Sequence, residues 1–237
     1  MQLMDGAVER LCSDREVYEQ LLDLDGKLVV ELGCGAAVHS RALASSGHAR
    51  EVLAFEVDSH QHALNLAAPA LARLSFRYGG AEAIALADAS VDVLMMFKSL
   101  HHVAVTAMRQ ALQEIHRVLK PAGFLYVCEP LFAGDFNGIL KLFHHEQRVR
   151  EAAFAALCDA VQDGLFELAA EEFYLTPSSF RDFAEFEQRI IGVTHTAHHL
   201  TPAVHAEVKR RFNARCGPHG ARFKNPMRAD LLRKPAS

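Results

Sequence analysis

The sequence of 237 residues lacks the features of secreted and membrane proteins. Its five cysteines are scattered and form no Cys-x-x-Cys pair, which indicates reduced thiols in a cytoplasmic protein. No apolar stretch approaches the roughly 20 residues of a membrane span. The N-terminus has no basic region followed by an apolar run, so we expect neither a secretory signal nor a membrane partner.

A strong excess of charge of one sign is also missing. The formal net charge is −4 and the pI is about 6.4, so we expect no field over the whole protein that would attract nucleic acid. Hydrophobic residues make up 50% and charged residues 23%, as in globular proteins, which excludes disordered and fibrous classes. The length suffices for a core without disulfide or metal support.

Short apolar runs alternate with helical patterns along the first 130 residues. The apolar runs lie at 28–30, 52–55, 75–78, 91–97 and 124–128, and the helical patterns lie at 6–24, 38–46, 60–74 and 105–119. This alternation predicts an α/β fold with a mainly parallel, doubly wound sheet. Ligands of such sheets bind at the carboxyl ends of the strands.

The pattern changes after Pro130. We predict mostly helix over 136–163, a sixth strand over 166–175, helices near 178–191 and 202–214, and a closing strand that begins near 221. No linker separates these parts. We therefore predict a single domain over 1–237, divided into an N-terminal helical segment (1–25), a ligand-binding core (26–130), helical cap insertions with the sixth strand (131–220), and a closing strand and tail (221–237).

The turn after the first strand carries the first motif, Glu31-Leu32-Gly33-Cys34-Gly35-Ala36-Ala37. Glycines allow a tight turn and a close approach of ligand to backbone, and the next helix presents free N–H groups. A dinucleotide site needs a third glycine where this chain has Val38. Glu31, two residues before the first glycine, instead suits a ligand with an ammonium group and no phosphates.

These residues resemble the first motif of the class I S-adenosylmethionine-dependent methyltransferases, an acid followed by Gly-x-Gly-x-Gly, with Ala37 in place of the last glycine. Later segments are also similar to the family: Ser90-Val91-Asp92 to Leu100-His101-His102-Val103, and Arg117-Val118-Leu119-Lys120-Pro121-Ala122-Gly123. The similarity covers about 18–130. It implies a seven-stranded Rossmann-like sheet with helical insertions after the fifth strand and between the sixth and seventh strands.

The resemblance also implies the cofactor and the residues that bind it. The cofactor would be S-adenosyl-L-methionine, with S-adenosyl-L-homocysteine as the product. Glu56 is expected to bind the ribose hydroxyls, with Asp58 as second choice, although an acid at this place also caps helices. The expected cofactor-binding residues are Glu31, Gly33, Cys34, Gly35, Glu56, Val57, Asp58, Gly80, Ala81, Glu82 and Lys98.

Histidines supply the candidate catalytic groups, because methyl transfer needs a base only if the acceptor carries a proton. His101 and His102 follow the fourth strand, and His144 lies in the first cap insertion, expected on a helix together with His145 and Glu146. His195 and His199 could share a helix face, but a third metal ligand is missing from that spacing, so we expect no metal.

The acceptor is expected to be a small molecule, because the cap insertions and their phenylalanines would enclose a pocket. The Asn/Asp-Pro-Pro-aromatic motif of base-modifying enzymes is absent, since Phe97-Lys98-Ser99-Leu100 stands in its place. Two alternatives stay open. The basic segment with Lys209-Arg210-Arg211 favours an RNA or protein methyltransferase. Ala37 and Gly80 leave room for a non-catalytic cofactor-binding protein of the same fold.

Overall fold

The computed structural model describes residues 1–3, 8–193, 198 and 200–236. Its first helix, α1 (Asp14–Leu21), begins with a reciprocal cap in which the Ser13 hydroxyl accepts from the Glu16 N–H and the Glu16 carboxylate accepts from the Ser13 N–H. The helical segment predicted for 6–24 is therefore shorter than expected. His195 and His199 lie outside the described residues.

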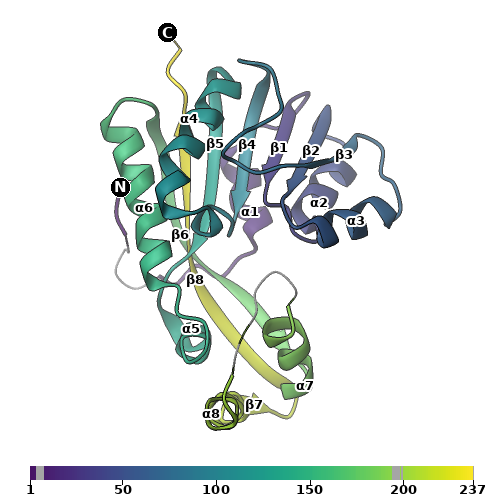
Figure 1. Cartoon of the computed structure of the whole chain (residues 1–237), viewed down its shortest axis with the longest axis vertical. Helices are drawn as coiled ribbons and strands as arrows, with labels where there is room; N and C mark the ends of the chain where they lie inside the picture. The colour runs from purple at the N-terminus through teal and green to yellow at the C-terminus, as the bar shows by residue number, and fades with distance from the viewer. Residues whose placement is uncertain (4–7, 194–197, 199, 237) are drawn as a thin grey trace.

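The sheet follows the predicted α/β plan (Figure 1). Its strands are β1 (Leu28–Leu32), β2 (Glu51–Glu56), β3 (Leu74–Tyr78), β4 (Val91–Phe97), β5 (Leu119–Pro130), β6 (Glu167–Phe180), β7 (Cys216–Gly217) and β8 (Gly220–Arg233). Seven of them are paired in the order β3-β2-β1-β4-β5-β8-β6. β1 to β5 are parallel, whereas β8 runs antiparallel to β5 and β6.

One detail of the strand count differs from the prediction. The expected closing strand is β8, and the two-residue β7 pairs with its first residues, which gives an eight-stranded sheet. A run as short as Cys216–Gly217 has no periodicity that sequence analysis can detect. The mainly parallel, doubly wound fold is confirmed.

The helices connect the strands as follows: α2 (Val38–Ser46), α3 (Ser59–Ala67), α4 (Met108–Val118), α5 (Gly134–Leu140), α6 (Gln147–Gln162), α7 (Phe183–Phe186) and α8 (Pro202–Asn213), with 3-10 turns η1 (Leu100–His102) and η2 (Val105–Ala107) and a π-helical turn η3 (Glu187–Ile191). α2 ends at Gly47, whose φ of 80° is left-handed. α3 ends at Ala67, shortly before Pro69, which cannot continue a helix.

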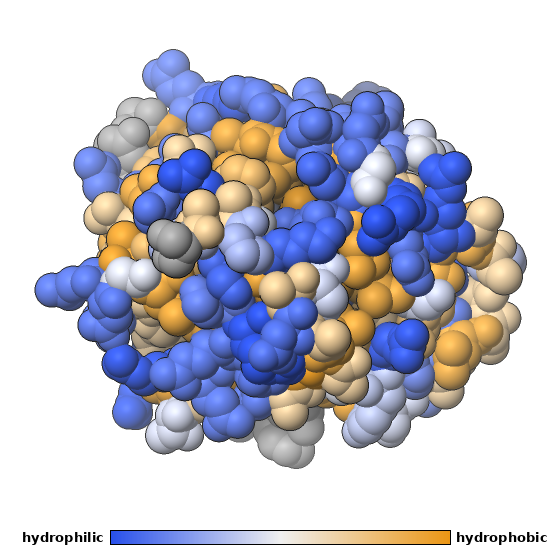
Figure 2. All heavy atoms as spheres, turned by 90° about the horizontal axis from the view of Figure 1, so that it is seen from above, coloured by the Kyte–Doolittle hydropathy of each residue, from blue (hydrophilic) through white to orange (hydrophobic). Residues whose placement is uncertain are grey.

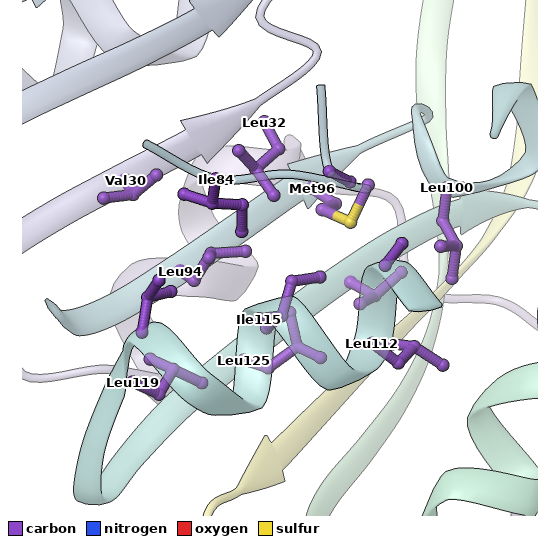
Figure 3. Close-up of a cluster of buried hydrophobic side chains, with 14 of the residues drawn as sticks. Val30, Leu32, Ile84, Leu94, Met96, Leu100, Leu112, Ile115, Leu119 and Leu125 are labelled. Carbon is purple, nitrogen blue, oxygen red and sulfur yellow. The ribbon is translucent and has the colours of Figure 1, made fainter. Parts of the chain in front are cut away.

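Alternate side chains of each central strand pack on opposite faces of the sheet. Val30, Leu94 and Leu125 lie on the face covered by α4 and belong to one buried cluster with Leu112 and Ile115 (Figure 3). Val29, Val93 and Tyr126 pack on the other face with Tyr18 of α1. The sheet is therefore buried on both sides, which explains why its strands read as continuous apolar runs.

β6 and β8 continue together past the end of the parallel strands as an antiparallel ribbon, with α5, α7 and α8 around its far end (Figure 1). A separate apolar cluster holds these elements together: Ile139, Phe180, Phe183, Phe186, Val208, Phe212, Ala221 and Phe223. The helix predicted near 178–191 begins later than expected, because residues 176–180 pair with 221–225 as part of the ribbon. Helical insertions follow β5 and β6 as predicted.

The surface is mainly polar, with apolar patches between the polar side chains. Figure 2 shows this mixture on the end of the molecule from which the C-terminal tail leaves. None of the described helices has both the length and the apolar composition that a membrane crossing requires.

Candidate active site

The glycine turn joins β1 to α2 at the carboxyl edge of the sheet. Gly33 has a φ of +70°, and a Cβ at this position would lie 2.7 Å from the Ser99 Cβ. Gly35 has a φ of +51°, and a Cβ there would meet only open space. Gly33 therefore permits close packing against η1, while Gly35 leaves space beside the backbone. Ala37, in place of the family's last glycine, is buried with a left-handed φ of 56°.

Glu56 ends β2 beside this turn and is 6% exposed. One carboxylate oxygen accepts from the Gly35 N–H at 2.7 Å, and the other accepts from the N–H groups of Val57 and Asp58, each at 2.8 Å. Its carboxylate thus holds the glycine turn and the end of β2 together. Asp58 has a different role, because its side chain caps α3 by accepting from the N–H groups of His60 and Gln61.

The loop after β3 lies against the same place. A Cβ at Gly80 would lie 2.6 Å from a carboxylate oxygen of Glu82 and 3.0 Å from Val57. Val57 is 57% exposed despite its apolar side chain, and Ala81 is buried. Gly80, Val57 and Glu82 therefore border one narrow space, and a side chain at position 80 would require Glu82 to move.

Glu31 is oriented differently from the other predicted cofactor residues. Its side chain is buried and accepts a hydrogen bond from the Ser40 hydroxyl on α2. Burial raises the pKa of Glu31 to about 8, although the bond from Ser40 acts in the opposite direction. At neutral pH the carboxyl is therefore mostly protonated and neutral. Cys34 is also buried, with its thiol beside Asn65.

Lys98 follows β4 with a left-handed φ of 55°. Its ammonium donates to the Asp14 carboxylate at 3.0 Å, and the Tyr174 hydroxyl donates to the other oxygen of Asp14 at 2.7 Å. Burial acts to raise the pKa of Asp14, but the charge of Lys98 and these hydrogen bonds lower it. Sequence analysis missed Asp14 because it looks like an ordinary acid in the first turn of a helix. The contacts join α1 to β4 and β6.

His101 lies in a buried charged group that joins η1, β5 and the turn before α6. Its Nδ1 bonds to the Glu129 carboxylate, and its Nε2 lies 3.5 Å from Glu146 Oε1. Burial alone would lower the pKa of His101, but the charges of Glu129 and Glu146 raise it to about 9. Against the effect of burial, His101 and Arg150 hold the pKa of Glu146 well below its usual range. Glu129, an acid that ends a strand at the ligand edge, was not predicted as a site residue.

His144 completes this group. Its Nε2 lies 2.6 Å from Glu146 Oε1, and Glu146 Oε2 accepts from Arg150 at the same distance. The prediction that residues 144–146 lie on a helix is wrong, because they form the turn between α5 and α6. The turn allows His144 and Glu146 to interact although they are two positions apart. A helix would place side chains at this spacing on different faces.

A cavity of about 410 Å³ lies between these residues and the ribbon. The three predicted catalytic histidines, His101, His102 and His144, all line it, as does Lys98. Ser99, which packs closely against Gly33, follows the lining residue Lys98 in the chain, so the cavity and the glycine turn are connected through η1 and its first residues. We call this cavity the acceptor pocket. A larger hollow of about 580 Å³ lies between α4 and α6, away from the predicted site residues of the glycine turn.

The strand order, the glycine turn after β1, the acid after β2 and the capped pocket together define the class I methyltransferase fold. The structure is similar to that of the YcgJ protein from Bacillus subtilis, with a TM-score of 0.66, 16% identity, and coverage of 94% of this chain and 98% of that chain. It is also similar to a protein from Bacillus halodurans described as a putative methyltransferase, with a TM-score of 0.65 and 15% identity. This similarity covers 94% of this chain and 99% of that chain.

Residues 30–127 match the protein family described as methyltransferase domain. A protein of Mycolicibacterium smegmatis, named a probable S-adenosylmethionine-dependent methyltransferase, is 31% identical over 156 residues, which are 64% of this chain and 57% of the relative. The chain spans about two fifths to three fifths of the length of the curated relatives it matches. Residues 30–127 are therefore similar to the methyltransferase domain family, and the chain shares the fold of the solved structures.

Proposed function

We propose that the protein transfers a methyl group from S-adenosylmethionine to a small molecule in the acceptor pocket. The main support for the proposal is the position of this pocket, about 410 Å³ in volume, between the residues that follow β4 and the cap elements. A volume of this size suits a metabolite rather than a nucleic-acid duplex. Proximity and alignment of two bound reactants contribute about 7–11 kcal/mol to such a transfer.

The cofactor residues fit a nucleoside without phosphates. Open space beside Gly35, the carboxylate of Glu56 and the slot at Gly80 lie together at the edge of the sheet. Glu56 would accept from the ribose hydroxyls, and the exposed face of Val57 would contact the base. When bound, S-adenosylmethionine supplies a methyl group that its positive sulfur already activates.

The histidines of the acceptor pocket would have different roles toward the acceptor. His101 already holds a proton at neutral pH, so it would supply positive charge rather than accept a proton. His144 lies in the wall of the pocket, and its Nε2 is 2.6 Å from Glu146 Oε1, a contact that orients the ring. We therefore assign His144 the role of proton acceptor, with His102 as the other candidate.

The structure favours this function over RNA binding by the segment Lys209-Arg210-Arg211. The guanidinium groups of Arg210 and Arg211 both pair with Glu207 at 2.7 Å, and Lys209 lies over the ring of Phe183 at 5.5 Å. The positive charge of this segment is therefore partly neutralised within α8 itself.

Two measurements test the proposal. Isothermal titration with S-adenosylmethionine and S-adenosylhomocysteine should show binding of both, and incubation of the protein with labelled cofactor and a cell extract should label the small-molecule fraction. Label in RNA or protein alone would contradict the small-molecule acceptor. The absence of heat with either nucleoside would contradict cofactor binding itself.

A further inference from the structure

We propose that the acceptor pocket binds a divalent transition-metal ion between His101, His102 and Glu146. In the described part of the chain, these three side chains each offer a ligand atom, and all three atoms lie within 4.8 Å of one another. The residues come from η1 and from the turn before α6, which are more than 40 positions apart in the chain. The fold therefore brings these residues together, because no local sequence motif contains all three.

The spacing of the ligand atoms fits one ion. Two ligands of a tetrahedral zinc ion lie about 3.3 Å apart, since each is about 2.0–2.1 Å from the metal. His101 Nε2 and Glu146 Oε1 are separated by 3.5 Å. The rings of His101 and His102 have centroids 4.1 Å apart, and a nitrogen of His102 lies within 4.8 Å of the ligand atoms of His101 and Glu146.

Glu129 orients His101 as carboxylates orient metal-binding histidines. It bonds to Nδ1 of His101 and also accepts from the N–H groups of Leu100 at 3.0 Å and His101 at 3.3 Å. These contacts fix the ring so that Nε2 points toward Glu146.

The charges and donor types indicate which ions fit. Glu129 and Glu146 place two negative charges around His101, and Arg150 supplies one positive charge beside Glu146. A divalent ion would lie between His101 Nε2 and Glu146 Oε1, with Glu129 bonded to the other ring nitrogen of His101. Two imidazoles and one carboxylate suit zinc, cobalt or iron, whereas magnesium and calcium prefer oxygen ligands alone.

Three protein ligands leave one coordination position free, as in catalytic metal sites. Because His101 and His102 line the acceptor pocket, this position would face the pocket. On the proposed function, it would hold an oxygen or nitrogen atom of the acceptor and orient it toward the methyl donor. The acceptor would then be a molecule with a metal-binding hydroxyl, carboxylate or amine.

Titration of the chelator-treated protein with Zn²⁺ by calorimetry tests the site. The wild-type protein should bind Zn²⁺, and His102→Ala and Glu146→Gln should each lower the affinity at least tenfold. Glu129→Gln should lower the Zn²⁺ affinity about 10- to 100-fold, because this variant lacks the carboxylate that orients His101. His60→Ala is the matched control, since His60 is an exposed histidine on α3, and it should bind as the wild type does.

Circular dichroism and S-adenosylhomocysteine binding should show that each variant is folded. Equal Zn²⁺ affinity of the wild type, His102→Ala and Glu146→Gln would place the ion at other histidines and overturn the proposal. Failure of the wild type to bind Zn²⁺ would also overturn it. If zinc binding fails one of these tests but S-adenosylhomocysteine still binds, only the metal proposal is contradicted. If zinc binds as expected but S-adenosylhomocysteine does not bind, only the proposed function is contradicted.

Discussion

At the scale of single residues, the glycine turn shows how two similar positions carry different requirements. Gly33 and Gly35 both have left-handed backbone angles, but only Gly33 is closely packed, against Ser99. Ser99 in turn donates to the Leu32 carbonyl at 2.8 Å. The turn therefore depends on both backbone freedom and the absence of a side chain.

Alanine at these two positions should separate the two requirements. Gly35→Ala should destabilise the protein by about 1–2 kcal/mol, the cost of a left-handed angle in an L-residue. Gly33→Ala should cost about 1–3 kcal/mol more because of the contact with Ser99. Urea unfolding measures both values. Equal losses in the two variants would show that Ser99 moves aside without cost.

The two acids after β2 should likewise differ. Glu56→Ala should weaken S-adenosylhomocysteine binding by about 1–3 kcal/mol, because it removes charge-assisted hydrogen bonds. Asp58→Ala should instead lower stability by about 1 kcal/mol through loss of the α3 cap, with little change in affinity. Calorimetry and thermal unfolding distinguish the effects. The reverse pattern would assign the ribose to Asp58.

The buried Glu31 should make stability depend on pH. The folded protein keeps this proton up to a pH of about 8, whereas the unfolded chain releases it near pH 4.5. Stability should therefore fall as the pH rises through this range, by an amount on the order of 2–4 kcal/mol. Glu31→Gln should remove this part of the slope, measured by urea unfolding between pH 4.5 and 8.5. Parallel curves for wild type and variant would contradict the neutral state of Glu31.

At the scale of elements, the molecule has separate apolar clusters for the sheet and for the cap. The central strands share theirs with α1, α2, α4 and α6, whereas the ribbon of β6 and β8 shares a phenylalanine-rich cluster with α5, α7 and α8. Phe186 is fully buried there and contacts the rings of Phe180, Phe183 and Phe212. The cap thus has its own source of stability.

Phe186→Ala should destabilise the cap by about 3–5 kcal/mol, the usual cost of such a cavity. Because the cluster around Phe186 is separate from the clusters of the sheet, hydrogen exchange should increase over 176–191 while β1 and β4 stay protected. Leu66→Ala, at an exposed position on α3, is the control and should change stability by less than about 0.5 kcal/mol. A uniform rise in exchange across the sheet would show that sheet and cap unfold together.

At the scale of the whole molecule, the proposed ligand edge is built from parts distant in the chain. The glycine turn, the ends of β2 and β3, η1 and the turn before α6 meet at the carboxyl ends of the parallel strands. Binding of a nucleoside at this edge would hold several elements in the folded arrangement at once. Binding and folding should therefore be coupled.

S-adenosylhomocysteine at about 100 times its dissociation constant should add about 2.7 kcal/mol to the free energy of unfolding. Urea unfolding with and without the nucleoside measures the gain, and Glu56→Ala should reduce it at the same concentration. Calorimetric binding without any such gain would mean that the unfolded chain binds the nucleoside equally well.

The sequence by itself determined the α/β class, most of the strands and the glycine turn, because apolar periodicity and backbone freedom are local properties. It also placed Glu56 at the end of β2. The sequence left open whether Asp58 binds the ribose or caps a helix, and the structure shows the α3 cap. Only the tertiary structure decided that residues 176–180 extend β6, since strand pairing depends on residues distant in the chain. The grouping of His101 with Glu129 and Glu146 was likewise decided by the fold. Their electrostatic interaction depends on distances of a few ångströms between elements that the sequence keeps far apart.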